Sequence, residues 1–237
     1  MQRAIALMVA AWIMAAPTAK HAATQKPSAH QILAKMVQTY AACKSYKDTG
    51  TVSTTTAGYS SEVKFSTAFE RPGRFRFEYT SDMAGMGGNH MVIWTEEDTV
   101  RTWWTIDHQV KTEESLDMAI AGATGVSSCS AHTIPRLLMP TEITGWALSD
   151  GENPKLIGRE RIGNVQCDKI ACIGPNKSSH IIWIGQADHL VYRIRTSMSA
   201  QSYHFVTTTD YKPQLNAKLT EADFRGVQEK QATPRHP

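Results

Sequence analysis

The sequence lacks the short motifs that mark common catalytic and metal sites. It contains no Cys-x-x-Cys, no His-Glu-x-x-His and no Gly-x-Ser-x-Gly, which excludes the usual signatures of zinc ribbons, zinc proteases and α/β-hydrolases. The histidines show no ligand-like spacing and are interpreted mostly as surface or turn residues; the set considered is 30, 90, 108, 132, 180, 189 and 204. We therefore predict no catalytic site, no metal site and no cofactor.

The chain also lacks a strong excess of either charge. Lys and Arg number 25 against 22 Asp and Glu, and loss of Arg3 and Lys20 with the first 23 residues leaves 23 against 22. A nearly neutral protein has no electrostatic basis for binding nucleic acid or an anionic membrane. Neither is expected as a partner.

No apolar run is long enough to cross a bilayer. The longest, AIALMVAAWIMAA, has about 13 residues, against the ~20 that a spanning helix needs. Arg3 precedes it and small residues with Pro17 follow it, which is the pattern of a secretory signal peptide. We predict a signal peptide at 1–23, a single domain at 24–225 and a disordered tail at 226–237. The mature protein is expected to be exported, soluble and without stable membrane insertion.

Four cysteines in an exported chain are disulfide candidates, namely Cys43, Cys129, Cys167 and Cys172. Cys167 and Cys172 fall on one predicted strand, where ~3.3 Å per residue puts them ~16 Å apart, beyond the ~7 Å limit for a bond. The interpretation favoured is a Cys43–Cys129 bond that ties the first helix to the central insert. A bond from either to the later two, and free buried thiols, stay open.

The spacing of apolar residues predicts one helix followed by many strands. Ser28 and Gln31 form a capping-box pattern, and Ile32, Leu33 and Met36 begin a helical stripe over 29–43. From Asp48 the period changes to two, which indicates strands separated by turns such as Pro72-Gly73 and Gly163-Asn164. Between 115 and 139 the alternation stops and short helices are expected. The sum is roughly ten antiparallel strands in two meanders.

One predicted hairpin carries a run of aromatic residues. In VKFSTAFERPGRFRFEY, Val63, Phe65 and Phe69 alternate before the turn, and Phe75, Phe77 and Tyr79 alternate after it. These six can share one face, while Lys64, Arg74, Arg76 and Glu78 face the other way as ordinary solvated surface. The aromatic face is either core or the lining of a cavity, and the pattern alone favours core.

At this hairpin the sequence resembles the LolA/LolB-like periplasmic carriers of lipoproteins, in an uncharacterised branch. The resemblance runs from Ile32 to Phe224 and includes YAACKSYKDTGTV, FSTAFERPGRFRFEY, MVIWTEEDTVRTWWTIDHQV, IPRLLMP and LTEADF. Arg71-Pro72 with Phe75 and Phe77 is its most specific part. Glu97-Asp98 departs from the Asp-Gly-Lys turn that is usual there.

The resemblance implies an α+β, mostly β fold: a curved antiparallel sheet, or half-open barrel, with helices across its concave face. It implies a soluble periplasmic carrier that holds a lipid or acylated ligand in an apolar cavity. The expected lining is Phe65, Phe69, Phe75, Phe77, Trp94 and Trp104, with Arg71 at the entrance holding a covering segment closed by hydrogen bonds. The alternative is a protein-interaction or envelope-stress sensing module of the same fold, whose partner is an envelope protein and which carries no lipid.

Overall fold

One antiparallel sheet dominates the protein. The structure, a computed structural model, describes residues 26–56, 58–81, 88–200 and 203–227; the predicted signal peptide and most of the predicted tail lie outside these ranges. The strands are β1 (Ser45–Thr56), β2 (Tyr59–Glu70), β3 (Arg74–Ser81), β4 (Asn89–Glu96), β5 (Thr99–Trp104), β6 (Val110–Glu113), β7 (Glu152–Ile162), β8 (Val165–Ile173), β9 (Ser179–Gly185), β10 (Val191–Ala200), β11 (Tyr203–Tyr211) and β12 (Gln214–Leu215).

The sheet is built from two meanders joined through β1 and β11. Its order is β6-β5-β4-β3-β2-β1-β11-β10-β9-β8-β7, and β12 pairs with the start of β1. Among the described residues the two edge strands, β6 and β7, do not pair. The sheet therefore stays open, which agrees with a half-open barrel and excludes a closed one. The expected α+β, mostly β class with an antiparallel sheet is confirmed.

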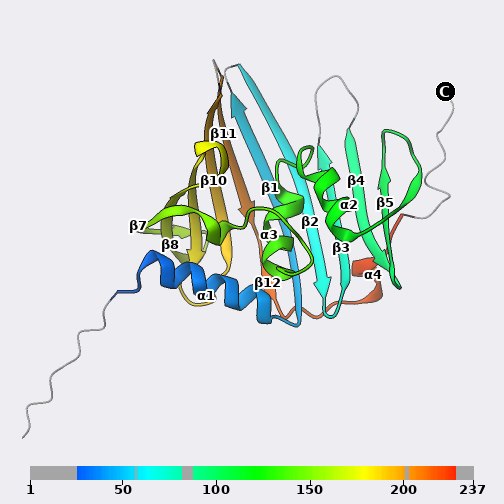
Figure 1. Ribbon diagram of the computed structural model, residues 1–237, viewed down its shortest axis with the longest axis horizontal. Coiled ribbons are helices and arrows are strands. Elements are labelled where there is room, and N and C mark those ends of the chain that lie inside the picture. Colours follow the sequence, from blue (N-terminus) through cyan, green and yellow to red (C-terminus); the bar gives the residue numbers. More distant parts are fainter. Residues whose placement is uncertain (1–25, 57, 82–87, 201–202, 228–237) are drawn as a thin grey trace, which may run out of the picture.

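Three helices cross one face of the sheet (Figure 1): α1 (Ala29–Ala42), α2 (Leu116–Thr124) and α3 (Ser130–Leu138). The predicted capping box of α1 is present, because Ser28 Oγ accepts from Gln31 N at 3.2 Å and Gln31 Oε1 accepts from Ser28 N at 2.8 Å. Two helices in the central insert also agree with the sequence. No helix in the described part of the chain is long and apolar enough to span a membrane.

The aromatic hairpin supplies the core between the sheet and the helices. Phe65 pairs with Tyr79 and Phe69 with Phe75 across β2 and β3, so their rings share one face as predicted. All are buried there together with Phe77 and with Tyr40 of α1. This half of the sheet is therefore a packed core. Burial of each large apolar side chain contributes about 1.5–3 kcal/mol to stability.

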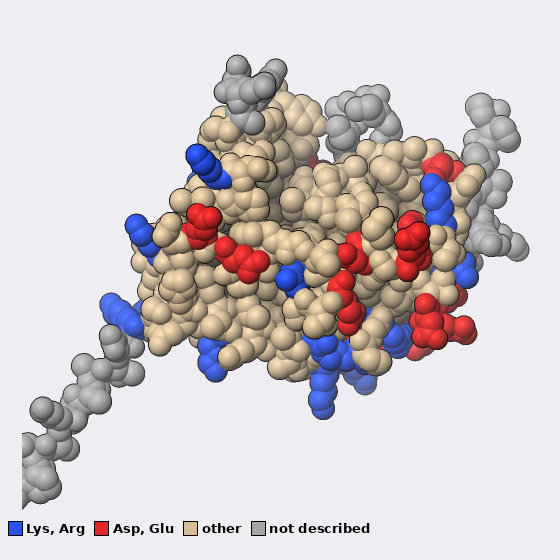
Figure 2. All heavy atoms as spheres, in the orientation of Figure 1, with Lys and Arg blue, Asp and Glu red and all other residues tan. Residues whose placement is uncertain are grey.

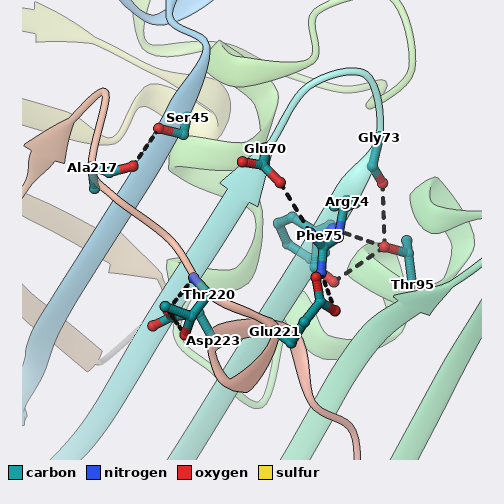
Figure 3. Close-up of polar contacts among 10 residues, drawn as sticks. All are labelled: Ser45, Glu70, Gly73, Arg74, Phe75, Thr95, Ala217, Thr220, Glu221 and Asp223. Atoms are coloured by element: carbon teal, nitrogen blue, oxygen red, sulfur yellow. Dashed lines mark hydrogen bonds and ion pairs between the residues drawn. The ribbon is translucent and has the colours of Figure 1, made fainter.

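The opposite face of the hairpin differs from the expectation of plain solvated surface. A C-terminal strap, defined here as residues 214–225 with α4 (Glu221–Phe224), lies over it (Figure 3). Ser45 Oγ donates to Ala217 O at 2.7 Å, and Arg74 lies 2.8 Å from Glu221 and 4.1 Å above the ring of Phe224. The alternation alone could not show this, because the strap is distant in sequence.

The strap gives the first testable expectation. Phe224→Ala removes the one buried side chain of α4 and its contact with Arg74. The strap should then detach locally at a cost of about 1–2 kcal/mol. Hydrogen exchange of 214–225 should then be fast while exchange in β9 and β10 stays slow. Lys218→Ala, an exposed change in the same segment, is the control; equal exchange in both variants would contradict the docking role of Phe224.

The predicted Cys43–Cys129 disulfide is not formed, and all four cysteines are free thiols. Arg71 bonds the carbonyls of both Cys43 and Leu138, so Cys43 lies beside the C-terminal end of α3. Cys129 is the N-cap at the other end of this helix, ~13 Å away at ~1.5 Å per residue. That separation exceeds the ~7 Å limit for a bond. Cys167 and Cys172 both lie on β8, as expected.

Candidate functional site

A cavity of about 580 Å³ lies on the helix-covered face of the sheet, over β9, β10, β11 and the far end of β1. Its sheet side is formed by Thr54, Ile194, Thr196, Met198, Thr207 and Thr209. Its opposite side is formed around the start of α3 by Ser128, Cys129, His132 and Thr133, together with Trp146 and Leu148. In Figure 1 these strands extend beyond α3, and in Figure 2 the surface in front of them is mostly uncharged.

Strand register places a row of polar side chains across the cavity wall. Thr54 of β1 pairs with Thr207 of β11, Thr207 pairs with Thr196 of β10, and Thr196 pairs with His180 of β9. Directly paired residues point to the same side of a sheet. We call Thr54, Thr207, Thr196 and His180 the hydroxyl row.

Hydrogen bonds connect the hydroxyl row at both ends. Thr54 Oγ1 and Thr207 Oγ1 are 3.3 Å apart, and Thr196 Oγ1 is 3.1 Å from His180 Nδ1. His180 Nε2 is 2.8 Å from Ser178 Oγ, which in turn donates to Pro175 O at 2.7 Å. The His180 end of the row is therefore bonded to the turn before β9, and the imidazole has a hydrogen-bond partner at both nitrogens.

His180 is a buried residue, which corrects its interpretation as a surface or turn histidine. His180 is 7% exposed. Its ring centroid lies 5.0 Å from that of Trp146, and the two ring planes are inclined by 33°. Burial lowers the pKa of His180, because a charged imidazolium loses its hydration there. The imidazole is thus neutral at neutral pH.

The cavity lining carries no formal charge. Among the described residues, those that line it include no Lys, Arg, Asp or Glu. Cys129 lies on the lining and is an exposed residue. Desolvation of its sulfur by the surrounding atoms raises the pKa of the thiol, which disfavours the nucleophilic thiolate. Within the described ranges no cluster of three His, Cys, Asp or Glu could hold a metal ion.

Arg71 joins the two helices that lie at the other end of this face. Its guanidinium donates to Cys43 O at 2.8 Å and to Ala41 O and Leu138 O at 2.7 Å each. These carbonyls belong to the C-terminal ends of α1 and α3, whose last carbonyls have no partner within the helix. The hydrogen bonds that the resemblance implied for Arg71 are present, and they tie the covering helices to each other and to the β2–β3 hairpin.

The other predicted lining residues lie next to the cavity or away from it. Phe65, Phe69, Phe75 and Phe77 are buried in the core, and Trp104 packs against the same core. Phe65 reaches the cavity wall through Tyr211, whose ring centroid is 5.4 Å from its own. Whether a ligand reaches these rings stays a prediction.

Trp94 is not brought together with the other predicted residues. It pairs with Arg76 on β3, whereas Phe75 and Phe77 point the other way, and it packs with Val92 and Trp103 on the opposite face. Gly226, assigned from the sequence to a disordered tail, lies against its indole. The predicted place of Trp94 is wrong because successive side chains along a strand point to opposite faces of the sheet.

The threonines of the cavity wall were missed because they are polar. The segment FVTTTDY holds alternate positions Phe205, Thr207, Thr209 and Tyr211, all of which line the cavity. Their period of two was visible in the sequence, but their polarity resembles that of a solvated strand face. Only the position of α3 over β10 and β11 shows that this face is covered.

Comparison with known proteins shows similarity at the level of structure only. No family model and no curated protein sequence matches the chain. A LolA superfamily protein from Nitrosomonas europaea matches with a TM-score of 0.34 and 13% identity over 84% of this chain and 98% of its own.

Two further solved structures extend the comparison. The lipoprotein LppX of Mycobacterium tuberculosis matches with a TM-score of 0.43 and 12% identity over 81% of this chain and 97% of its own. The MucA/MucB complex of Pseudomonas aeruginosa contains a chain that matches with a TM-score of 0.46 and 12% identity, over 85% of this chain and 62% of its own. The solved structures similar to this chain thus include a protein of the LolA superfamily.

Proposed function

We propose that this protein is an exported, soluble binding protein that holds an acyl-bearing ligand in the cavity over β9, β10 and β11. The observation that carries the proposal is the cavity itself. Its volume of about 580 Å³ falls within the ~300–1,000 Å³ typical of ligand sites. An apolar N-terminal run with the form of a signal peptide supports a periplasmic location.

The lining supports an amphiphile as the ligand. Ile194, Met198, Leu148 and Phe205 supply apolar surface, and the hydroxyl row supplies polar atoms. Each CH₂ moved out of water gains ~0.8 kcal/mol, so a twelve-carbon chain gains roughly 10 kcal/mol before the entropic cost of association. A longer chain would extend toward Phe65, which lies at the border of the packed core beside Tyr211.

The lining favours binding over catalysis. His180 is bonded at both nitrogens, so neither nitrogen is available as a base without breaking a hydrogen bond. Desolvation raises the pKa of the Cys129 thiol, which disfavours the thiolate. A ligand that enters this cavity meets surface to pack against and hydroxyls to bond, which suits a carrier.

Filling the cavity tests the proposal. Thr207→Trp places an indole where the wall now carries a small side chain, and should weaken binding of the neutral fluorescent probe N-phenyl-1-naphthylamine by about tenfold or more. Val206→Trp makes the matched change one residue along β11, on the opposite face, and should leave the affinity unchanged. Fluorescence titration measures both.

Equal affinity in the two variants would reject the cavity as the binding site. Absence of probe binding to the wild-type protein, together with recovery of an envelope protein in stoichiometric complex, would instead support the protein-interaction alternative.

A further inference from the structure

The hydroxyl row is more polar than an acyl chain requires. The direction of each of its hydrogen bonds follows from the number of hydrogens that each side chain carries. Ser178 Oγ has a single hydrogen, which it donates to Pro175 O at 2.7 Å. In its 2.8 Å bond with His180 Nε2, Ser178 Oγ must therefore accept. His180 consequently carries its proton on Nε2.

The tautomer of His180 sets the role of Thr196. A neutral imidazole has one N–H, so Nδ1 is an acceptor when Nε2 holds the proton. Thr196 Oγ1, 3.1 Å from Nδ1, must donate its only hydrogen to it. Toward the cavity, Thr196 then offers lone pairs and no proton, so the ligand has to supply a donor there.

The neighbouring threonine pair offers the complementary group. Thr54 Oγ1 and Thr207 Oγ1 lie 3.3 Å apart, and in such a pair one hydroxyl donates to the other. The second keeps a hydrogen that it can give to a ligand acceptor. The wall therefore presents one acceptor at Thr196 and one donor at the Thr54–Thr207 pair, on adjacent strands of the same row.

A ligand hydroxyl both donates and accepts, and so it satisfies this wall. A carboxylate or phosphate has only acceptors when ionised, so Thr196 would face it lone pair to lone pair. The described lining has no Lys or Arg to neutralise such an anion, and an unpaired charge in an apolar cavity is costly.

We infer that the cavity selects an uncharged, hydroxyl-bearing amphiphile over an anionic one, with Thr196 as the group that accepts the ligand's hydroxyl proton. This inference rests on the proposed function and deepens it to a ligand class. The hydroxyl can come from a glycerol or from a sugar, since both present the same donor and acceptor to the row.

Four probes that share a twelve-carbon chain test the inference: monolauroylglycerol, dodecyl glucoside, methyl laurate and laurate. At pH 8, calorimetry or probe displacement should show at least one of the two hydroxyl-bearing compounds binding about tenfold more tightly than methyl laurate and laurate. The tighter of the two identifies the source of the hydroxyl. This comparison uses the wild-type protein and depends on no variant.

Thr196→Val then tests the assigned residue, because it removes the hydroxyl and keeps the β-branched shape. The affinity for the preferred hydroxyl compound should fall about fivefold to tenfold, and the affinity for methyl laurate should not change. Thr208→Val, on the opposite face of β11, is the control and should change neither of these two affinities.

The outcomes separate the two claims. If laurate or methyl laurate binds wild type as tightly as both hydroxyl compounds, the inference is overturned and the proposed function stands. An unchanged preference in Thr196→Val overturns the role of Thr196. If none of the four binds, the proposed function and the inference fail together.

Discussion

Replacing Asp48 with Asn is expected to raise the free energy of unfolding by about 2 kcal/mol at pH 8 and by almost nothing at pH 4. Asp48 lies on β1 inside the core and is 1% exposed. Tyr46 Oη donates to its Oδ2 at 2.8 Å, and none of the ion pairs among the described residues includes it. Burial raises the pKa of Asp48 from 3.8 to about 6.

The pH dependence follows from which state binds the proton more tightly. Between about pH 4 and pH 6 the folded protein holds a proton on Asp48 that the unfolded chain has lost, so stability falls as the pH rises through this window. A rise of the Asp48 pKa from 3.8 to about 6 corresponds to about 3 kcal/mol. Asn keeps an acceptor for Tyr46 and does not ionise, so it should recover most of that amount above pH 6.

Urea unfolding of both proteins from pH 4 to pH 8 measures this difference, and groups such as Glu78 cancel because they are present in both. A stability difference that does not change with pH would contradict a buried, unpaired carboxylate at this position.

Replacing Arg71 with Met should lower the free energy of unfolding by about 3 kcal/mol. The variant loses the guanidinium bonds to Ala41 O, Cys43 O and Leu138 O. Hydrogen bonds to a charged group contribute about 1.5–3 kcal/mol each, and water can replace part of this at a partly exposed site. Arg71→Lys keeps the charge but has no fork to reach all three carbonyls, and it should lie between wild type and Arg71→Met.

Arg74→Met is the matched control on the same hairpin, because Arg74 pairs with a partly exposed Glu70 and a largely exposed Glu221. Such pairs contribute roughly 0–1 kcal/mol each. If denaturant unfolding shows Arg71→Met to be no less stable than Arg74→Met, Arg71 does not hold the covering helices.

Since α3 also forms one side of the cavity, Arg71→Met should release a bound probe faster.

The sequence allowed the sheet, the first helix and the aromatic core to be predicted, because each depends on local periodicity. Phe65, Phe69, Phe75 and Phe77 follow a period of two around a clear turn, and Ser28 with Gln31 marks a helix start. The position of the cavity depends on which strands pair across the centre of the sheet. Nothing in the local pattern of Thr207 or Thr196 indicates that β11 pairs with both β1 and β10.

Two errors have the same physical origin. Trp94 was placed with the aromatic core because it is large and apolar, although its register with Arg76 puts it on the other face. The sequence favours a Cys43–Cys129 bond between the first helix and the central insert, although the two residues lie at opposite ends of α3. Residue type indicated burial correctly in the case of Cys43 and Trp94, but position relative to a partner needed the three-dimensional arrangement.

Recovery of lipid from the purified protein tests the central claim most directly. Solvent extraction followed by mass spectrometry should yield about one uncharged acyl lipid per wild-type molecule isolated from an expressing cell envelope, and much less from Thr207→Trp at equal protein. A lipid-free extract from wild type, or equal lipid recovery from both proteins, would contradict a ligand held between α3 and strands β9, β10 and β11.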